Sequence, residues 1–110
     1  MQITIHRGTH EIGGSCVEIR TRQAKILLDL GLPLDFDSRP QEQQEQIRRE
    51  ALEWAQDADA IFISHYHADH HGLLPDTHQD VASYATAGTA AMMHVTEVIH
   101  GRGDADYLRH

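Results

Sequence analysis

Residues 61–75 read IFISHYHADHHGLLP, and this stretch decides how the rest of the chain is organised. Its first three residues are apolar and predict a buried β-strand. Four side chains that can bind a metal ion follow this strand within six positions, namely His65, His67, Asp69 and His70. We therefore expect a metal site at the point where the strand ends.

His65 and His67 are two residues apart, so in an extended segment their side chains leave on the same side and can converge on one ion. Asp69 and His70 follow where the chain turns, and can point at a neighbouring position. Imidazole and carboxylate ligands suit zinc, manganese or ferrous iron, and no cysteine lies nearby to complete a closed structural zinc site. The alternative is a polar loop rich in histidine by chance, in a chain that has 10 histidines.

The segment HYHADH, residues 65–70, resembles the His-x-His-x-Asp-His signature of the metallo-β-lactamase superfamily. The resemblance implies an α+β fold, the N-terminal half of an αββα sandwich with a mixed β-sheet and flanking helices. It implies that His65 and His67 hold one ion and that Asp69 and His70 hold a second. Zinc is the expected metal, with Mn2+ or Fe2+ as alternatives. The resemblance also makes Asp69 a catalytic residue, which orients the attacking water or carries its proton.

Asp29, in the sequence Asp29-Leu30-Gly31, resembles the first acidic motif of the same superfamily. In that family the carboxylate lies behind the metal-binding loop and holds it by hydrogen bonds without binding metal itself. Groups of this kind orient and tune the ligands. The alternative is an ordinary turn at a strand end.

Residues 8–16, GTHEIGGSC, resemble the opening of the RNA-processing branch of the superfamily, the ribonuclease J type. There a Glu-Ile/Val-Gly stretch precedes the second strand, as Glu11-Ile12-Gly13 does here. The alternative is a simple glycine-rich turn. The resemblance implies an ester or phosphodiester substrate, and the Glu11-Ile12-Gly13 stretch favours a phosphodiester or RNA. It assigns no role to His10 or Glu11.

The chain has 110 residues and a formal net charge of −8. It is one domain at most, and its charge gives no general footprint for nucleic acid. No apolar run approaches a membrane span and no leader is visible, so we expect no membrane partner. The single cysteine, Cys16, fits a reducing compartment and a cytoplasmic protein.

The remaining elements follow from local patterns. Ile3 and Ile5 alternate with polar residues, which predicts a half-buried strand, and the apolar run in 25–29 predicts a strand covered on both faces. A helix is expected over 38–55, capped by Ser38 with Gln41 and anchored in the core by Trp54. Two further strands are expected over 15–20 and 81–85. A second helix is expected from about Thr89 to a stop at Gly101, with Met92 and Met93 as core residues. Its apolar stripe consists of Ala91, Met92, Val95, Val98 and Ile99.

The resemblance covers about residues 1–100, and it implies three further ligands that this chain does not supply. None of His78, His94, His100 and His110 lies in a matching context. We therefore interpret residues 1–110 as a single partial domain that lacks the second half of the sandwich. Three interpretations follow, and the favoured one is a fragment of a longer hydrolase. The others are a small protein completed by a dimer partner or a complementing C-terminal half, and a gene remnant. An unfinished sandwich also leaves one apolar sheet face exposed.

Two functions remain open from the sequence. The first is a metal-dependent hydrolase of this superfamily, with zinc at two sites in the complete domain and nuclease activity on a phosphodiester or RNA. The second is a non-catalytic metal-binding or assembly module that pairs with another subunit.

Overall fold

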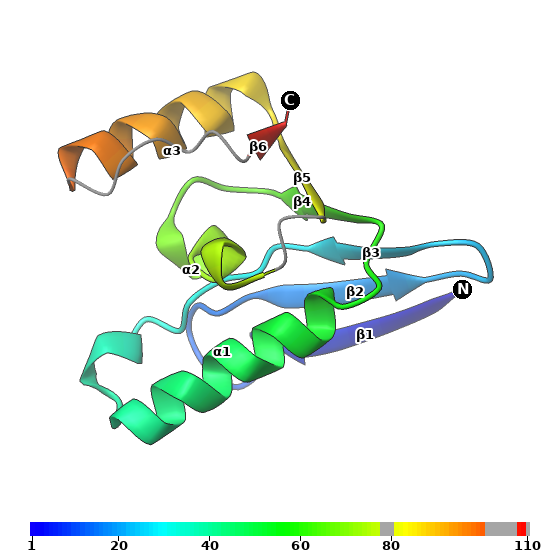
Figure 1. Cartoon of the computed structure of the whole chain (residues 1–110), viewed down its shortest axis with the longest axis horizontal. Helices are drawn as coiled ribbons and strands as arrows, with labels where there is room; N and C mark the ends of the chain where they lie inside the picture. Colours follow the sequence, from blue (N-terminus) through cyan, green and yellow to red (C-terminus); the bar gives the residue numbers. More distant parts are fainter. Residues whose placement is uncertain (78–80, 101–107, 110) are drawn as a thin grey trace.

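The computed structural model describes residues 1–77 and 81–100 and the backbone of 108–109 (Figure 1). Its strands are β1 (Gln2–Arg7), β2 (Cys16–Arg20), β3 (Lys25–Leu28), β4 (Ala60–Ile63), β5 (Ala82–Ala85) and β6 (Leu108–Arg109). Its helices are α1 (Gln41–Ala55), α2 (Ala68–His71) and α3 (Ala87–Ile99), with short 3-10 turns at Phe36–Ser38 and Leu74–Asp76. None of the helices in the described ranges is long and apolar enough to cross a lipid bilayer.

The strands form one mixed sheet in chain order, from β1 to β6. β1, β2 and β3 are antiparallel, as expected for a meander, and β3, β4, β5 and β6 run parallel. The change of direction after β3 requires a crossover, which α1 supplies between β3 and β4. The α+β class predicted from the sequence is confirmed, and the parallel half places the carboxyl ends of β3 and β4 side by side.

One face of the sheet carries the core. Leu27 of β3 and Ile61 of β4 are fully buried there, and they belong to one apolar cluster with Ile47 and Ala51 of α1. In Figure 1, α1 runs along this side of the meander. Leu73, which follows the histidine-rich stretch, is also fully buried in this cluster.

The opposite face of the sheet is apolar and exposed. Register pairs its residues across five strands in two rows, Ile3–Ile19–Ile26–Ala60–Ala82 and Ile5–Val17–Leu28–Phe62–Tyr84. Ile3 is 59% exposed, Ile5 56% and Phe62 43%, and the rings of Phe62 and Tyr84 stack at 5.4 Å. The exposed apolar sheet face predicted for an unfinished sandwich is therefore present. We call these two rows the open face.

Two burial predictions for the strands are wrong for this reason. Thr4 and His6, and not Ile3 and Ile5, turn toward the helical side of β1. In β3, Leu27 is buried but Leu28 is 38% exposed, so this strand is covered on one face only.

The helix boundaries also differ from the sequence prediction. Ser38 does not cap α1, because it ends a 3-10 turn in which its hydroxyl donates to the carbonyl of Asp35. Arg39 is extended at ψ 149°, as a residue before proline prefers, and α1 begins only after Pro40.

The third helix starts earlier than expected, at Ala87, because Thr86 caps it by accepting a hydrogen bond from the Thr89 amide. Met93 is buried as predicted, but Met92 is 44% exposed and is not a core residue. Val98 and Ile99 of the apolar stripe are also exposed. The expected stop at Gly101 lies outside the described residues.

Candidate metal centre

The histidine-rich stretch forms a loop and one turn of helix at the carboxyl end of β4. We call residues 64–71 the His loop. Ile61 and Ile63 fix the strand before it, because both are buried in the core. The chain then leaves the sheet at Ser64 and turns into α2, whose four residues include Asp69 and His70.

The His loop is held from behind by the segment that follows β3. Leu30 donates its backbone N–H to the carbonyl of His70 at 2.9 Å, and Leu32 donates to Ala68 at 3.0 Å. Gly31 lies between them, so close that a β-carbon there would overlap the carbonyl oxygen of Asp69. Glycine is therefore required at position 31, because only without a β-carbon there can the backbone of the His loop come this close to the segment after β3.

His65 and His67 point at each other, as their two-residue spacing predicted. Nε2 of His65 lies 2.7 Å from Nδ1 of His67, and the two rings are nearly perpendicular. Around a tetrahedral zinc ion with bonds of about 2.0–2.1 Å, two donor atoms lie roughly 3.3 Å apart. The observed 2.7 Å is shorter than this, so the two nitrogens would have to move apart to hold one ion.

Asp69 and His70 form a second pair. Oδ2 of Asp69 lies 3.5 Å from Nε2 of His70, which is close to the spacing of two donors around one ion. Both side chains are partly exposed. In residues 1–77 and 81–100, no three His, Cys, Asp or Glu side chains are grouped closely enough to hold one ion. The structure thus brings the four predicted ligands together as two pairs.

Asp29 lies behind the second pair. Its Oδ2 is 2.8 Å from Nδ1 of His70, and because a carboxylate only accepts, Nδ1 carries the hydrogen. Asp29 also accepts hydrogen bonds from the amide and the hydroxyl of Ser64, at 2.7 and 2.6 Å. This arrangement leaves the lone pair on Nε2 of His70, so the residues present fit a metal ion held from the side of Asp69.

His71 was missed by the sequence reasoning. It is 4% exposed, and its Nε2 donates to the carbonyl of Tyr66, at 2.9 Å, between the first two histidines. In the sequence, His71 is the histidine nearest the apolar pair Leu73-Leu74, and this position is the signal that distinguishes it from the four predicted ligands. We interpret it as a residue that fixes the loop backbone.

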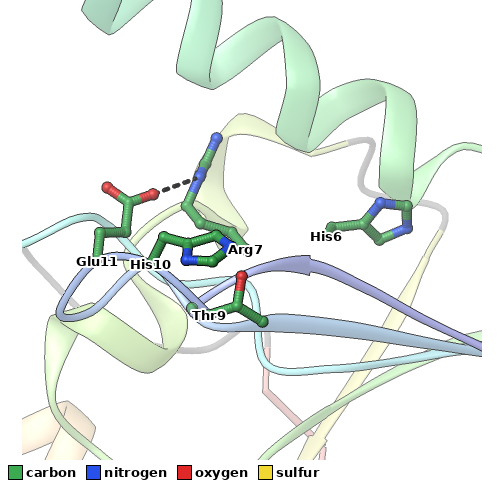
Figure 2. Close-up of a pocket in the computed structure, with 6 residues that line it drawn as sticks. His6, Arg7, Thr9, His10 and Glu11 are labelled. Atoms are coloured by element: carbon green, nitrogen blue, oxygen red, sulfur yellow. Dashed lines mark ion pairs between the residues drawn. The ribbon is translucent and has the colours of Figure 1, made fainter.

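His10 and Glu11 belong to the loop between β1 and β2. They line a cavity of about 330 Å3 with His6, Arg7, Gly8 and Thr9 (Figure 2). Within the part of the chain that the structure describes, Nη1 of Arg7 is the one buried side-chain polar atom without a hydrogen-bond partner. None of the predicted ligands lines this cavity.

Cys16 is a core residue. It is fully buried, and burial raises the pKa of its thiol to about 12, against smaller opposing effects of Arg7 and Lys25. The thiolate, which is the form that binds metals, is therefore strongly disfavoured.

Comparison with known proteins identifies the fold and the family of this chain. The fold resembles that of the short form of human tRNase Z, with a TM-score of 0.52 at 20% identity, over 96% of this chain and 41% of that one. The sequence profile of the metallo-beta-lactamase superfamily matches residues 11–104. The chain belongs to this superfamily, as its HYHADH signature predicted.

Two curated relatives are similar to this chain over most of its length. The chain is 32% identical over 94 residues to an RNase J-like protein of Methanocaldococcus jannaschii, covering 86% of this chain and 20% of the relative. It is 29% identical over 99 residues to the cleavage and polyadenylation specificity factor 73 of Drosophila melanogaster, covering 90% of this chain and 13% of the relative. The chain thus spans a fifth or less of the length of either of these relatives.

Proposed function

We propose that this chain forms the first half of the metal-binding domain of a hydrolase that cleaves a phosphodiester, with RNA as the substrate. The observation that carries the proposal is the pair of donor sets, His65 with His67 and Asp69 with His70, at one strand end. The Asp29 carboxylate, 2.8 Å from Nδ1 of His70, supports it because it fixes the tautomer that a ligand needs.

In this proposal each residue has a distinct task. His65 and His67 hold one divalent ion through Nε2 and Nδ1, and Asp69 and His70 hold the other. Zinc is the expected metal, because imidazole and carboxylate donors suit it, and Mn2+ and Fe2+ are alternatives. Such ions supply an activated water and polarise the phosphoryl group. Asp69 has a second carboxylate oxygen with which to orient that water or accept its proton.

The choice of RNA is supported by the relatives and not by the surface charge. The RNase J-like protein carries a ribonuclease name, and the chain matches it over 94 residues. The net charge of −8 offers no attraction for a polyanion, so in this proposal the bound ions attract the substrate phosphate.

We further propose that another polypeptide segment completes the domain by covering the open face. Two donors from protein are fewer than the three that catalytic zinc usually has. The open face, with Ile3, Ile5 and Phe62 largely exposed, is the surface on which a second sheet can pack. This segment is either a complementing C-terminal half or a second copy, and it would supply the missing ligands.

The alternative function is a non-catalytic metal-binding or assembly module. The open face favours this alternative too, because pairing with another subunit is itself a reason to keep such a surface. The two functions differ in what happens to RNA once the domain is complete.

The test measures metal, mass and cleavage on the same protein. Untagged chain is analysed for metal content and solution mass, then incubated with end-labelled RNA and Zn2+ or Mn2+, alone and with a complementing half. The hydrolase predicts metal-dependent cleavage that His67→Ala abolishes and that His94→Ala, a histidine on α3, leaves intact. Metal uptake or association without cleavage under every condition would instead establish the module.

A further inference from the structure

The loop between β1 and β2 packs directly against Asp69. We call residues 8–14 the glycine loop, since Gly8, Gly13 and Gly14 all have positive φ. A β-carbon at Gly13 would lie 2.9 Å from the β-carbon of Asp69. The Ser15 amide, just after the loop, donates to the Asp69 carbonyl at 3.2 Å. The glycine loop therefore forms the wall on one side of the Asp69 side chain.

Glu11 ties this loop to two cations outside it through its side chain. Arg39 donates from Nη2 to Oε2 of Glu11 at 2.7 Å, and Nε of Arg7 lies 3.4 Å from Oε1. Figure 2 shows the side chains of Glu11 and Arg7 turned toward each other across the loop. One carboxylate thus contacts two cations, one in β1 and one just before α1.

Both cations are themselves held in place. Arg7 is 8% exposed at its side chain, lies over the Trp54 ring at 4.7 Å and approaches Glu50 at 3.5 Å. Arg39 also donates from Nε to Asp35 at 2.8 Å. The Arg7–Glu11–Arg39 contacts therefore connect the glycine loop to α1 and to the turn before it.

The stability gained from these contacts is small, because Glu11 is about one third exposed and such pairs are screened by solvent. Their effect is on position. Glu11 is two residues from Gly13, and Leu34 holds the intervening Ile12 carbonyl through a longer hydrogen bond of 3.3 Å. Without Glu11, the glycine loop keeps its backbone contacts, among them the hydrogen bond from the Gly14 amide to the Leu32 carbonyl at 2.9 Å, but it loses the side-chain contacts to both arginines.

We propose that Glu11 is a positioning residue for the second metal pair, and that the Arg7–Glu11–Arg39 contacts hold the glycine loop against Asp69 so that its carboxylate stays oriented toward His70. This inference rests on the proposed metal-binding function. It explains why an acidic residue precedes Gly13 in this loop, a feature to which the sequence assigned no role.

The test is a double-mutant cycle on zinc affinity, measured by calorimetry on the 110-residue chain. Glu11→Ala is expected to weaken zinc binding about tenfold, at the low end of the effect of groups that orient ligands. In an Asp69→Asn background the same change is expected to have no further effect, because Glu11 acts through Asp69. Glu11→Gln is expected to restore part of the affinity, since its amide oxygen still accepts from Arg39.

Asp35→Asn is the matched control. It weakens the other contact of Arg39 at 2.8 Å but leaves the glycine loop tied, so zinc affinity should stay within about twofold of wild type. Circular dichroism of each variant checks the fold, and Glu11→Gln carries the test if Glu11→Ala does not fold.

The outcomes separate the two proposals. Wild-type chain that binds no zinc, either alone or together with the complementing half, overturns the metal-binding function and this inference with it. Zinc binding by the wild type that Glu11→Ala leaves unchanged overturns this inference alone. The inference also fails if Glu11→Ala weakens zinc binding by the same factor in the Asp69→Asn background. Glu11 would then affect zinc affinity by a route that does not pass through Asp69.

Discussion

Asp29 joins the end of β3 to both ends of the His loop, because it accepts a hydrogen bond from Nδ1 of His70 at 2.8 Å and another from the Ser64 amide at 2.7 Å. Its backbone has φ +62°, a conformation that aspartate and asparagine tolerate better than most residues. The carboxylate thereby selects the His70 tautomer with a free Nε2. A substitution of Asp29 therefore changes the tautomer of His70, although His70 itself is unchanged.

Asp29→Asn is expected to lower zinc affinity about 10- to 100-fold. Asparagine fits the backbone and can still accept from Ser64, but its amide group donates toward His70 and favours the tautomer that carries hydrogen on Nε2. Asp59→Asn is the matched control, since Asp59 accepts a backbone N–H from Lys25 at 2.8 Å at the far end of the same strand pair. Titration calorimetry measures both variants, and an equal loss of affinity in the two would contradict a specific role for Asp29.

The His loop was predictable from sequence because its information is local. Residue types and their spacing within six positions specify which side chains meet, and the structure places His65 beside His67 at 2.7 Å as the spacing indicated. The pairing of Asp29 with His70 joins residues 41 apart, and only the family resemblance made it predictable.

Burial along the strands was harder to predict, since alternation defines two faces but does not say which one is covered. In β1 the helices cover the face that carries Thr4 and His6, where the His6 ring stacks on Trp54 at 4.7 Å. Ile3 and Ile5 lie on the other face, the open face, where they are 59% and 56% exposed. The alternation in β1 therefore identified its two faces, but it did not say which of them the helices cover.

Gly31→Ala is expected to destabilise the protein by more than about 3 kcal/mol, the upper range for overpacking. Its β-carbon would overlap the backbone of Asp69, which cannot move without displacing the His loop. Gly88→Ala is the control, because no atom lies within 4 Å of the added carbon and the site is in α3. That variant should gain about 0.5–1 kcal/mol from helix propensity. Urea unfolding measures both, and similar free energies for the two variants would refute the close approach at Gly31.

Cys16 predicts a loss of stability in alkaline solution. Its pKa is about 12 in the folded chain, raised by burial from an ordinary 9.0, so between these values the unfolded thiol ionises and the folded one does not. The unfolded state then binds fewer protons, and the free energy of unfolding falls by about 1.4 kcal/mol per pH unit above roughly pH 9. Cys16→Ala should remove this slope. Unfolding curves from about pH 8 to 10.5 test it, and identical slopes in the two proteins would show that the thiol ionises in the fold.

The lowered pKa of Glu18 predicts a loss of stability in acidic solution. Burial alone would raise the pKa of this carboxyl, but hydrogen bonds from His6 and Arg20 and the charge of Lys25 outweigh burial and lower it. A lowered pKa in the folded state means that the carboxylate stabilises the fold above its ordinary value of 4.5, and that this contribution is lost as the pH falls through the lowered pKa.

Glu18→Gln should therefore cost roughly 1–3 kcal/mol at neutral pH, the range for a buried hydrogen-bonded group that loses its charge. The difference from wild type should begin to shrink below pH 4.5, where the carboxyl of the unfolded chain takes up a proton. It should vanish once the pH is below the lowered pKa of the folded chain, because the wild-type carboxyl is then protonated as well. The exposed Glu53 on α1 provides the control, and Glu53→Gln should stay within about 0.5 kcal/mol of wild type at every pH. Thermal unfolding from about pH 3 to 7 measures all three proteins. Parallel curves for wild type and Glu18→Gln across this whole range would mean that the His6–Glu18 contact at 3.2 Å does not bias the ionisation of Glu18.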